Sequence, residues 1–307
     1  TGESIATVSS AGINFAAAVE YARTVGGPRL RELTFHDRAG ILRALGKHIL
    51  ADTAALYDLS TATGATRSDS WIDIEGGAGV LMAYSGIGRR EMPNAKGIID
   101  GEPVSLSRDG SVRGAHIISP RPGVAVHINA FNFPCWGMLE KLAPTFLAGM
   151  AMIVKPASQT SYLTELMVRS IIESGILPEG SLQLISGNAG DLLDHLGPQD
   201  TVAFTGSADT ARRLRTHPAI IDNSVRFNAE ADSLNAAILG ESATPGTPEF
   251  ELFVAEVVKE MTTKAGQKCT AIRRVLVPSG VAADVEEALV ARLAAVRVGD
   301  PADAETD

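Results

Sequence analysis

Val124-Ala-Val-His-Ile128 is a short apolar run typical of a buried β-strand, and it opens the part of the chain that decides the fold. A helix opened by Pro134 follows it, and strand and helix then alternate as far as residue 239. Further strands are predicted at Ala151–Lys155, Leu182–Ser186, Thr201–Thr205, Val225–Asn228 and Ala236–Leu239, with helices at 160–174, 189–196 and 207–216. The alternation predicts an α/β fold with a Rossmann-type, mostly parallel sheet covered by helices on both faces. Ligands of such sheets bind at the carboxyl ends of the strands.

The segments before this region have a different pattern. Residues 11–24, 34–62 and 69–90 show helical spacing of apolar side chains, which predicts an N-terminal helical part at 1–92. Residues 93–121 are rich in Pro, Gly, Asp and Ser, which favours a hairpin or an extended connector. An extended arm of this kind is able to pair with another subunit.

Composition excludes several classes of partner. The chain has 307 residues, of which 45% are hydrophobic and 21% charged, as in soluble globular proteins. The net charge of −9, without a basic run, argues against nucleic acid and an anionic membrane surface. Two cysteines without a CxxC motif argue against a disulfide framework and indicate a reducing compartment, so we expect a cytoplasmic protein. We predict no metal site and no membrane span.

Cys269 lies in the stretch Met261-Thr-Thr-Lys-Ala-Gly-Gln-Lys-Cys-Thr-Ala-Ile-Arg-Arg274. Four cations flank it with no acidic residue between them: Lys264, Lys268, Arg273 and Arg274. Cationic surroundings lower the pKa of a thiol and favour the nucleophilic thiolate. A structural role is the alternative, because free cysteines are often simply buried. Cys135 is interpreted as a packed residue, with a thiol that pairs with Cys269 as the alternative.

Four polar stretches lie at strand ends or in the turns that follow: Asn129-Ala-Phe-Asn-Phe-Pro134, Lys155-Pro-Ala-Ser158, Phe204-Thr-Gly-Ser207 and Asn228-Ala-Glu230. Each has an ordinary interpretation by itself, as a turn residue, a solvated charge, a helix cap or a surface carboxylate. The usual GxGxxG dinucleotide fingerprint is absent from the sequence. Only the combination of these stretches, at the edge where ligands bind, predicts a site.

In this order and spacing the stretches resemble the aldehyde dehydrogenase superfamily, and within it the branch of phenylacetate-degradation aldehyde dehydrogenase domains. The resemblance covers essentially all 307 residues and is carried by His127–Pro144, Ser186–Leu196, Ala229–Asn235 and Glu260–Arg274. It implies that Cys269 attacks an aldehyde to give a thiohemiacetal and later a thioester. It also implies that Asn132 and the Cys269 backbone N–H hold the oxyanion, and that Glu230 is the general base.

The resemblance further implies a nicotinamide cofactor, bound by Lys155, Ser158, Gly187, Gly206 and Ser207. Gly206 and Ser207 match a helix-opening turn that receives the pyrophosphate, where free N–H groups favour an anion. Many NAD-preferring relatives carry Glu where this chain has Ser158. We therefore expect NADP, with NAD possible.

The sequence departs from the family pattern in two places. The usual Glu-Leu-Gly-Gly-Lys is Glu230-Ala-Asp-Ser-Leu234, and Asp209 puts a carboxylate near the expected phosphate turn, where it is able to act as a helix cap. The sequence therefore leaves the contacts to the nicotinamide undecided at residues 230–234, and it leaves the contacts to phosphate undecided at Asp209.

The implied substrate is a CoA-linked semialdehyde of aromatic catabolism. We expect 3-oxo-5,6-dehydrosuberyl-CoA semialdehyde, with the box-pathway substrate 3,4-dehydroadipyl-CoA semialdehyde as the alternative. Alternatives from other classes are a catalytically inactive nucleotide-binding fragment and a cysteine acyltransferase or thioesterase. Relatives imply a homo-oligomer, a dimer or larger.

The chain begins at Thr1 without Met, and relatives continue well past the cysteine, so we interpret it as part of a longer protein. In family terms we expect the helical part of the cofactor lobe at 1–92, the arm at 93–121, the nucleotide-binding lobe at 122–245 and the beginning of the catalytic lobe at 246–307.

Overall fold

The computed structural model describes residues 4–307 and divides the chain into two compact units. The first unit contains the chain up to Leu59 together with Ile72–Ala231. The second contains Ser60–Trp71 together with Asp232–Asp307. Each unit has a hydrophobic core of its own.

The first unit is built on a five-stranded parallel sheet in the order β5-β4-β3-β6-β7. Its strands are β3 (Val124–Ile128), β4 (Ala151–Lys155), β5 (Leu182–Leu184), β6 (Thr201–Gly206) and β7 (Arg226–Ala231). All five residues of β3 are buried, as the continuous apolar run predicts for a central parallel strand. The predicted α/β fold is confirmed.

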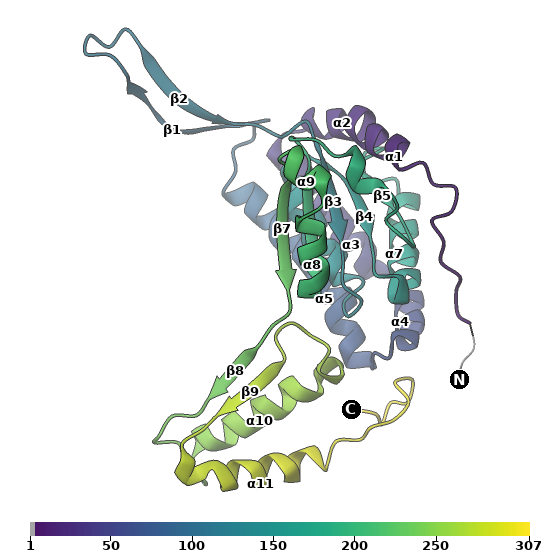
Figure 1. Ribbon diagram of the computed structural model, residues 1–307, viewed down its shortest axis with the longest axis vertical. Coiled ribbons are helices and arrows are strands. Elements are labelled where there is room, and N and C mark those ends of the chain that lie inside the picture. Colours follow the sequence, from purple (N-terminus) through teal and green to yellow (C-terminus); the bar gives the residue numbers. More distant parts are fainter. Residues whose placement is uncertain (1–3) are drawn as a thin grey trace. The chain divides into compact units, whose positions relative to one another are not determined.

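Helices cover both faces of this sheet (Figure 1). The chain moves outward from β3 to β5 on one side and from β6 to β7 on the other, so right-handed crossovers place their helices on opposite faces. The helices between the strands are α6 (Trp136–Leu147), α7 (Ser161–Glu173), α8 (Ala208–Arg215) and α9 (Pro218–Asp222). The switch in direction falls between β3 and β6, which is where such sheets bind ligands.

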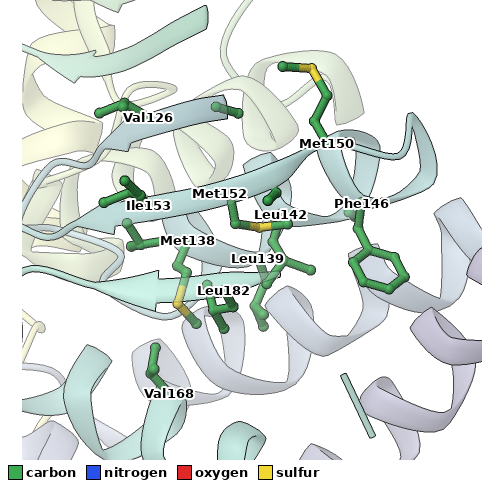
Figure 2. Close-up of a cluster of buried hydrophobic side chains, with 14 of the residues drawn as sticks. Val126, Met138, Leu139, Leu142, Phe146, Met150, Met152, Ile153, Val168 and Leu182 are labelled. Carbon is green, nitrogen blue, oxygen red and sulfur yellow. The ribbon is translucent and has the colours of Figure 1, made fainter. Parts of the chain in front are cut away.

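The core of the first unit lies between α6, α7 and the sheet. Met138 and Leu142 on α6 lie beside Met152 of β4, and Phe146 belongs to the same buried cluster (Figure 2). Phe146 and Met152 are completely buried. This packing fixes the strands whose ends carry most of the predicted site.

The N-terminal helices pack against this core. They are α1 (Phe15–Tyr21), α2 (Gly27–Arg31), α3 (Phe35–Ala51), α4 (Ala54–Ser60) and α5 (Arg67–Arg90). A capping box of Thr34 and Asp37 begins α3. Arg38 is completely buried and donates to the carbonyls of Leu30, Leu33 and Leu147, and burial lowers its pKa to about 10. These hydrogen bonds link α3 to the C-terminal ends of α2 and α6.

The expected connector is a hairpin of β1 (Ile98–Ser105) and β2 (Arg113–Ile118), which pair with each other and with no other strand among residues 4–307 (Figure 1). Its large apolar side chains are exposed to solvent, among them Ile99, Val104, Leu106 and Ile117. An isolated two-stranded ribbon is marginal in water, so this hairpin is suited to pairing with something else.

The second unit contains a two-stranded parallel sheet of β8 (Asn235–Ile238) and β9 (Ile272–Leu276), with α10 (Pro248–Thr262) and α11 (Ala282–Leu293). Phe250 and Val254 of α10 pack with Val285 of α11 in its core. No helix in the described part of the chain is long and apolar enough to cross a bilayer.

Two sequence predictions were wrong in detail. The strand predicted at Ala236–Leu239 was placed in the main sheet but is β8 of the second unit. The chain leaves the main sheet at Asp232, whose φ of 55° ends the extended backbone. The helix predicted at 189–196 is only a 3-10 turn at Leu192–His195, because Gly190 has a φ of 50° and cannot begin an α-helix.

Candidate active site

The predicted cofactor residues of the first unit, and the predicted catalytic residues Glu230 and Asn132, lie along one edge of its sheet. Gly187 follows β5, Lys155 ends β4, Gly206 ends β6 and Glu230 lies near the end of β7. Asn132 lies in the turn that follows β3. Because all five strands are parallel, their carboxyl ends share this edge.

Buried polar atoms without a hydrogen-bond partner mark the same edge. Both amide atoms of Asn129, the Ser186 hydroxyl and the Thr205 hydroxyl are buried and have no partner in the described part of the chain. Asn129 follows β3, Ser186 follows β5, and Thr205 lies near the end of β6. In the strand order these strands lie on both sides of β4, which ends in Lys155. A buried polar group without a partner costs about 1–3 kcal/mol, so this edge suits a polar ligand. The residues therefore fit a dinucleotide.

Sequence reasoning assigned no role to these three side chains. Asn129 and Thr205 lie in two of the four polar stretches, and Ser186 begins the segment Ser186–Leu196 that carries the family resemblance. The signal available was a polar residue at or just after the last position of an apolar strand.

Lys155 and Ser158 lie on the turn after β4. Burial lowers the Lys155 pKa below its usual value, so a bound anion would be favoured beside it. Ser158 is exposed and begins a 3-10 turn, where its carbonyl accepts a hydrogen bond from the Ser161 hydroxyl at 3.1 Å. Its small neutral side chain puts no negative charge at this position.

The turn before α8 begins a helix at Ser207, as the sequence predicts, whereas its binding of pyrophosphate stays a prediction. The Ser207 hydroxyl caps the helix by accepting from the Thr210 backbone N–H at 3.3 Å. A Cβ at Gly206 would lie 2.5 Å from the Phe204 ring, so a larger residue does not fit. Asp209 does not cap the helix but pairs with Arg212 at 3.3 Å.

Gly187 also has a structural reason to be glycine. Its φ of 105° is unfavourable for other residues, and a Cβ there would lie 2.8 Å from the Ser10 backbone nitrogen. Its assignment to the cofactor site stays a prediction.

The backbone on both sides of Asn132 is held by side chains. The Thr160 hydroxyl donates to the Phe131 carbonyl at 3.0 Å, and Asp73 of α5 accepts from the Cys135 and Trp136 backbone N–H groups at 3.1 and 2.8 Å. Cys135 itself is completely buried, as expected for a packed residue.

Cys269 lies in the second unit, in the loop before β9, and is exposed. The alternative of a buried structural cysteine is therefore wrong for this residue. The Asn235 amide donates to the Cys269 carbonyl, and Arg273 donates to the Gly266 carbonyl at 2.8 Å. Both contacts fix the backbone around the thiol.

The cations around Cys269 are less free than the sequence suggested. Lys268 pairs with Glu260 of α10 at 2.8 Å, and Lys264 is only 5% exposed. The sequence prediction looked for acidic residues only between the cations, whereas the Glu260 carboxylate comes from α10, which precedes all four of them.

Comparison with known proteins identifies the family. The model of the "Aldehyde dehydrogenase family" matches residues 1–307. The chain belongs to this family. It is 47% identical over 302 residues to a 3,4-dehydroadipyl-CoA semialdehyde dehydrogenase of Aromatoleum evansii, covering 98% of this chain and 58% of that protein.

Solved structures of aldehyde dehydrogenases share the fold. Betaine aldehyde dehydrogenase of Staphylococcus aureus in complex with NAD+ has a TM-score of 0.81 at 25% identity, covering 95% of this chain and 55% of the other. An NADP-dependent enzyme of E. coli has a TM-score of 0.81 at 24% identity, covering 95% and 58%, and its likeness shows the fold alone. The chain spans a little over half the length of these relatives.

One departure of this aldehyde dehydrogenase chain from the family pattern has a structural explanation. Asp232 stands where the usual Glu-Leu-Gly-Gly-Lys has its first glycine, and its φ is 55°. Asp adopts this left-handed conformation more readily than most residues. The backbone conformation that glycine favours is thus present without the glycine.

Proposed function

We propose that the protein containing this chain oxidises an aldehyde to a carboxylic acid, with Cys269 as the nucleophile and NADP as the hydride acceptor. The observation that carries the proposal is the exposed Cys269 thiol, in the family's Gly-Gln-Lys-Cys turn of a chain matched by the family over residues 1–307. The buried polar edge of the parallel sheet supports a dinucleotide.

In the proposed chemistry the Cys269 thiolate forms a bond to the aldehyde carbon, and the carbonyl π electrons move to oxygen. The Asn132 amide and the Cys269 backbone N–H donate to that oxyanion. A nicotinamide cofactor, held by Lys155, Ser158, Gly187, Gly206 and Ser207, would supply the hydride acceptor that lets the oxyanion collapse to a thioester. Glu230 then takes a proton from water, whose oxygen attacks the thioester carbon, and the C–S bond breaks to release the acid and the Cys269 thiolate; Glu230 returns its proton to solvent.

For the substrate we propose a CoA-linked semialdehyde. The relative at 47% identity bears the name of a dehydrogenase for 3,4-dehydroadipyl-CoA semialdehyde, which favours the box-pathway substrate over the phenylacetate-derived 3-oxo-5,6-dehydrosuberyl-CoA semialdehyde. The ratio of kcat/KM for the two substrates in the full-length protein tests this choice, and a clear preference for the second would reverse it.

For the cofactor we propose NADP, because Ser158 leaves neutral space beside the partly buried Lys155. A kcat/KM at least about tenfold higher with NADP than with NAD is expected, which corresponds to about 1.4 kcal/mol. Equal or better turnover with NAD would contradict it.

The decisive experiment compares the two cysteines in the full-length protein. Cys269→Ala is expected to abolish aldehyde-dependent NADPH formation, whereas Cys135→Ala, at the buried cysteine, retains it. Normal turnover by Cys269→Ala would refute the proposed mechanism. Thioester cleavage by the wild type without any nicotinamide would favour a cysteine hydrolase instead.

We also propose a homo-oligomer, supported by the exposed apolar side chains of the β1–β2 hairpin. Light scattering of the full-length protein, with and without residues 98–118, is expected to show that removal of the hairpin reduces the assembled mass. An unchanged mass would exclude the hairpin as the interface.

A further inference from the structure

The turn that leads to Cys269 has an unusual backbone. Lys264, Ala265 and Gly266 have φ values of 56°, 50° and 69°. Only glycine adopts this left-handed region without steric cost, so the two preceding residues are strained. Such strain persists when the surrounding structure holds it in place.

A carboxylate from a distant part of the sequence binds this turn. Asp69, in the first turn of α5, accepts a hydrogen bond from the Lys264 backbone N–H at 2.7 Å. Both residues belong to the second unit, and they are 7% and 5% exposed. A buried carboxylate is costly unless it is hydrogen-bonded, so this contact accounts for the burial of Asp69.

A comparison with α3 shows that helix capping alone does not explain Asp69. The sequence Thr34-Phe-His-Asp37 begins α3, and Thr66-Arg-Ser-Asp69 begins α5. In the first box the backbone bonds are 2.9 and 3.1 Å long, and Asp37 is exposed. In the second box both bonds are 3.4 Å long. The shorter bond of Asp69 therefore goes to the turn before Cys269 and not to its own helix.

We propose that Asp69 is a positioning residue that holds the strained Lys264–Gly266 turn and thereby sets the backbone that carries Cys269. Its catalytic consequence rests on the proposed function, since it acts through the nucleophile. The Cys269 N–H and sulfur would lose their fixed directions if the turn relaxed, and misplacement of reacting groups lowers the rate of the chemical step. In this role Asp69 orients the Cys269 thiol and does not itself contact the substrate.

The test uses three variants of the full-length protein. Asp69→Ala removes the acceptor, Asp69→Asn keeps an amide oxygen that can accept from Lys264, and Asp37→Ala removes the equivalent capping carboxylate of α3. Hydrogen exchange of the peptide that contains the Lys264 amide is the first readout. We expect about tenfold or faster exchange there in Asp69→Ala, partial protection in Asp69→Asn, and no change in Asp37→Ala.

Steady-state kinetics supply the second readout. We expect kcat to fall at least about tenfold in Asp69→Ala, with the KM values for aldehyde and NADP nearly unchanged, a smaller loss in Asp69→Asn, and wild-type kcat in Asp37→Ala. Unchanged exchange at Lys264 in Asp69→Ala would overturn the proposal, as would a kcat no lower than that of Asp37→Ala.

The two proposals fail separately. If Cys269→Ala keeps its turnover, the proposed function fails, while the exchange measurement still decides whether Asp69 holds the turn. If Asp69→Ala does not fold, a fourth variant, Asp69→Leu, which fills similar space without a hydrogen-bond acceptor, decides instead: exchange at Lys264 and kcat both equal to the wild type would reject the proposal.

Discussion

In the first unit, Lys155, Gly206 and Glu230 lie on parallel strands whose positions are fixed by a buried sheet and its helices. In the second unit, Cys269 follows three left-handed residues held by hydrogen bonds to polar side chains, above all Asp69. Apolar packing positions the first set, and a few polar contacts position the second. The two units should therefore respond to different substitutions.

The largest expected effect comes from truncating one buried phenylalanine in each unit. Phe146→Ala removes a completely buried ring from the sheet unit and is expected to lower its free energy of unfolding by about 3–5 kcal/mol. Phe250→Ala acts on a much smaller core that relaxes more easily, so we expect a smaller loss, about 2–3 kcal/mol. Urea unfolding followed by circular dichroism measures both. A larger loss in Phe250→Ala would show that packing governs the second unit as well.

The next expected effect is the response of the sheet unit to acid. His127 of β3 is 1% exposed, and burial, with a smaller contribution from the Lys141 cation, lowers its pKa from 6.5 to about 3. The unfolded chain therefore binds a proton near pH 6.5, whereas the folded chain does so only near pH 3. Stability is lost as the pH falls through this window, by about 2 kcal/mol between pH 6.5 and 5.

The variant His127→Gln isolates this contribution. Glutamine does not titrate and is able to keep the hydrogen bond that links the ring to the Thr145 hydroxyl at 3.1 Å. The difference between the unfolding free energies at pH 7 and pH 5 should shrink by about 2 kcal/mol in this variant. His116→Gln, on the exposed hairpin, is the control. An equal shrinkage in both variants would contradict a role for burial.

The same contrast explains what the sequence could predict. The apolar run at Val124–Ile128 and its successors predicted the sheet, because strands and helices have fixed periods. The predicted residues then fell at the sheet edge because parallel strands share their carboxyl ends. The sequence could not predict the hydrogen bond from the Lys264 backbone N–H to Asp69, because 195 residues separate the two and no local pattern encodes such a pairing. The departure of β8 from the sheet depended likewise on one left-handed residue, Asp232.

The smallest expected effect concerns the strained turn itself. Ala265 has a φ of 50°, which costs an L-residue about 1–2 kcal/mol. Glycine removes that cost but loses about 0.5–1 kcal/mol of backbone entropy on folding. Ala265→Gly should therefore stabilise the second unit slightly, by up to about 1 kcal/mol.

The control is the same substitution at a right-handed position of the same unit. Ala288→Gly, within α11, should destabilise by about 1 kcal/mol, since glycine is a poor helix former. Opposite signs for these two variants in thermal unfolding would establish that the turn before Cys269 stores strain. If both variants destabilise the unit equally, Ala265 bears no strain, and the hydrogen bond from Lys264 to Asp69 then stabilises a turn that would form without it.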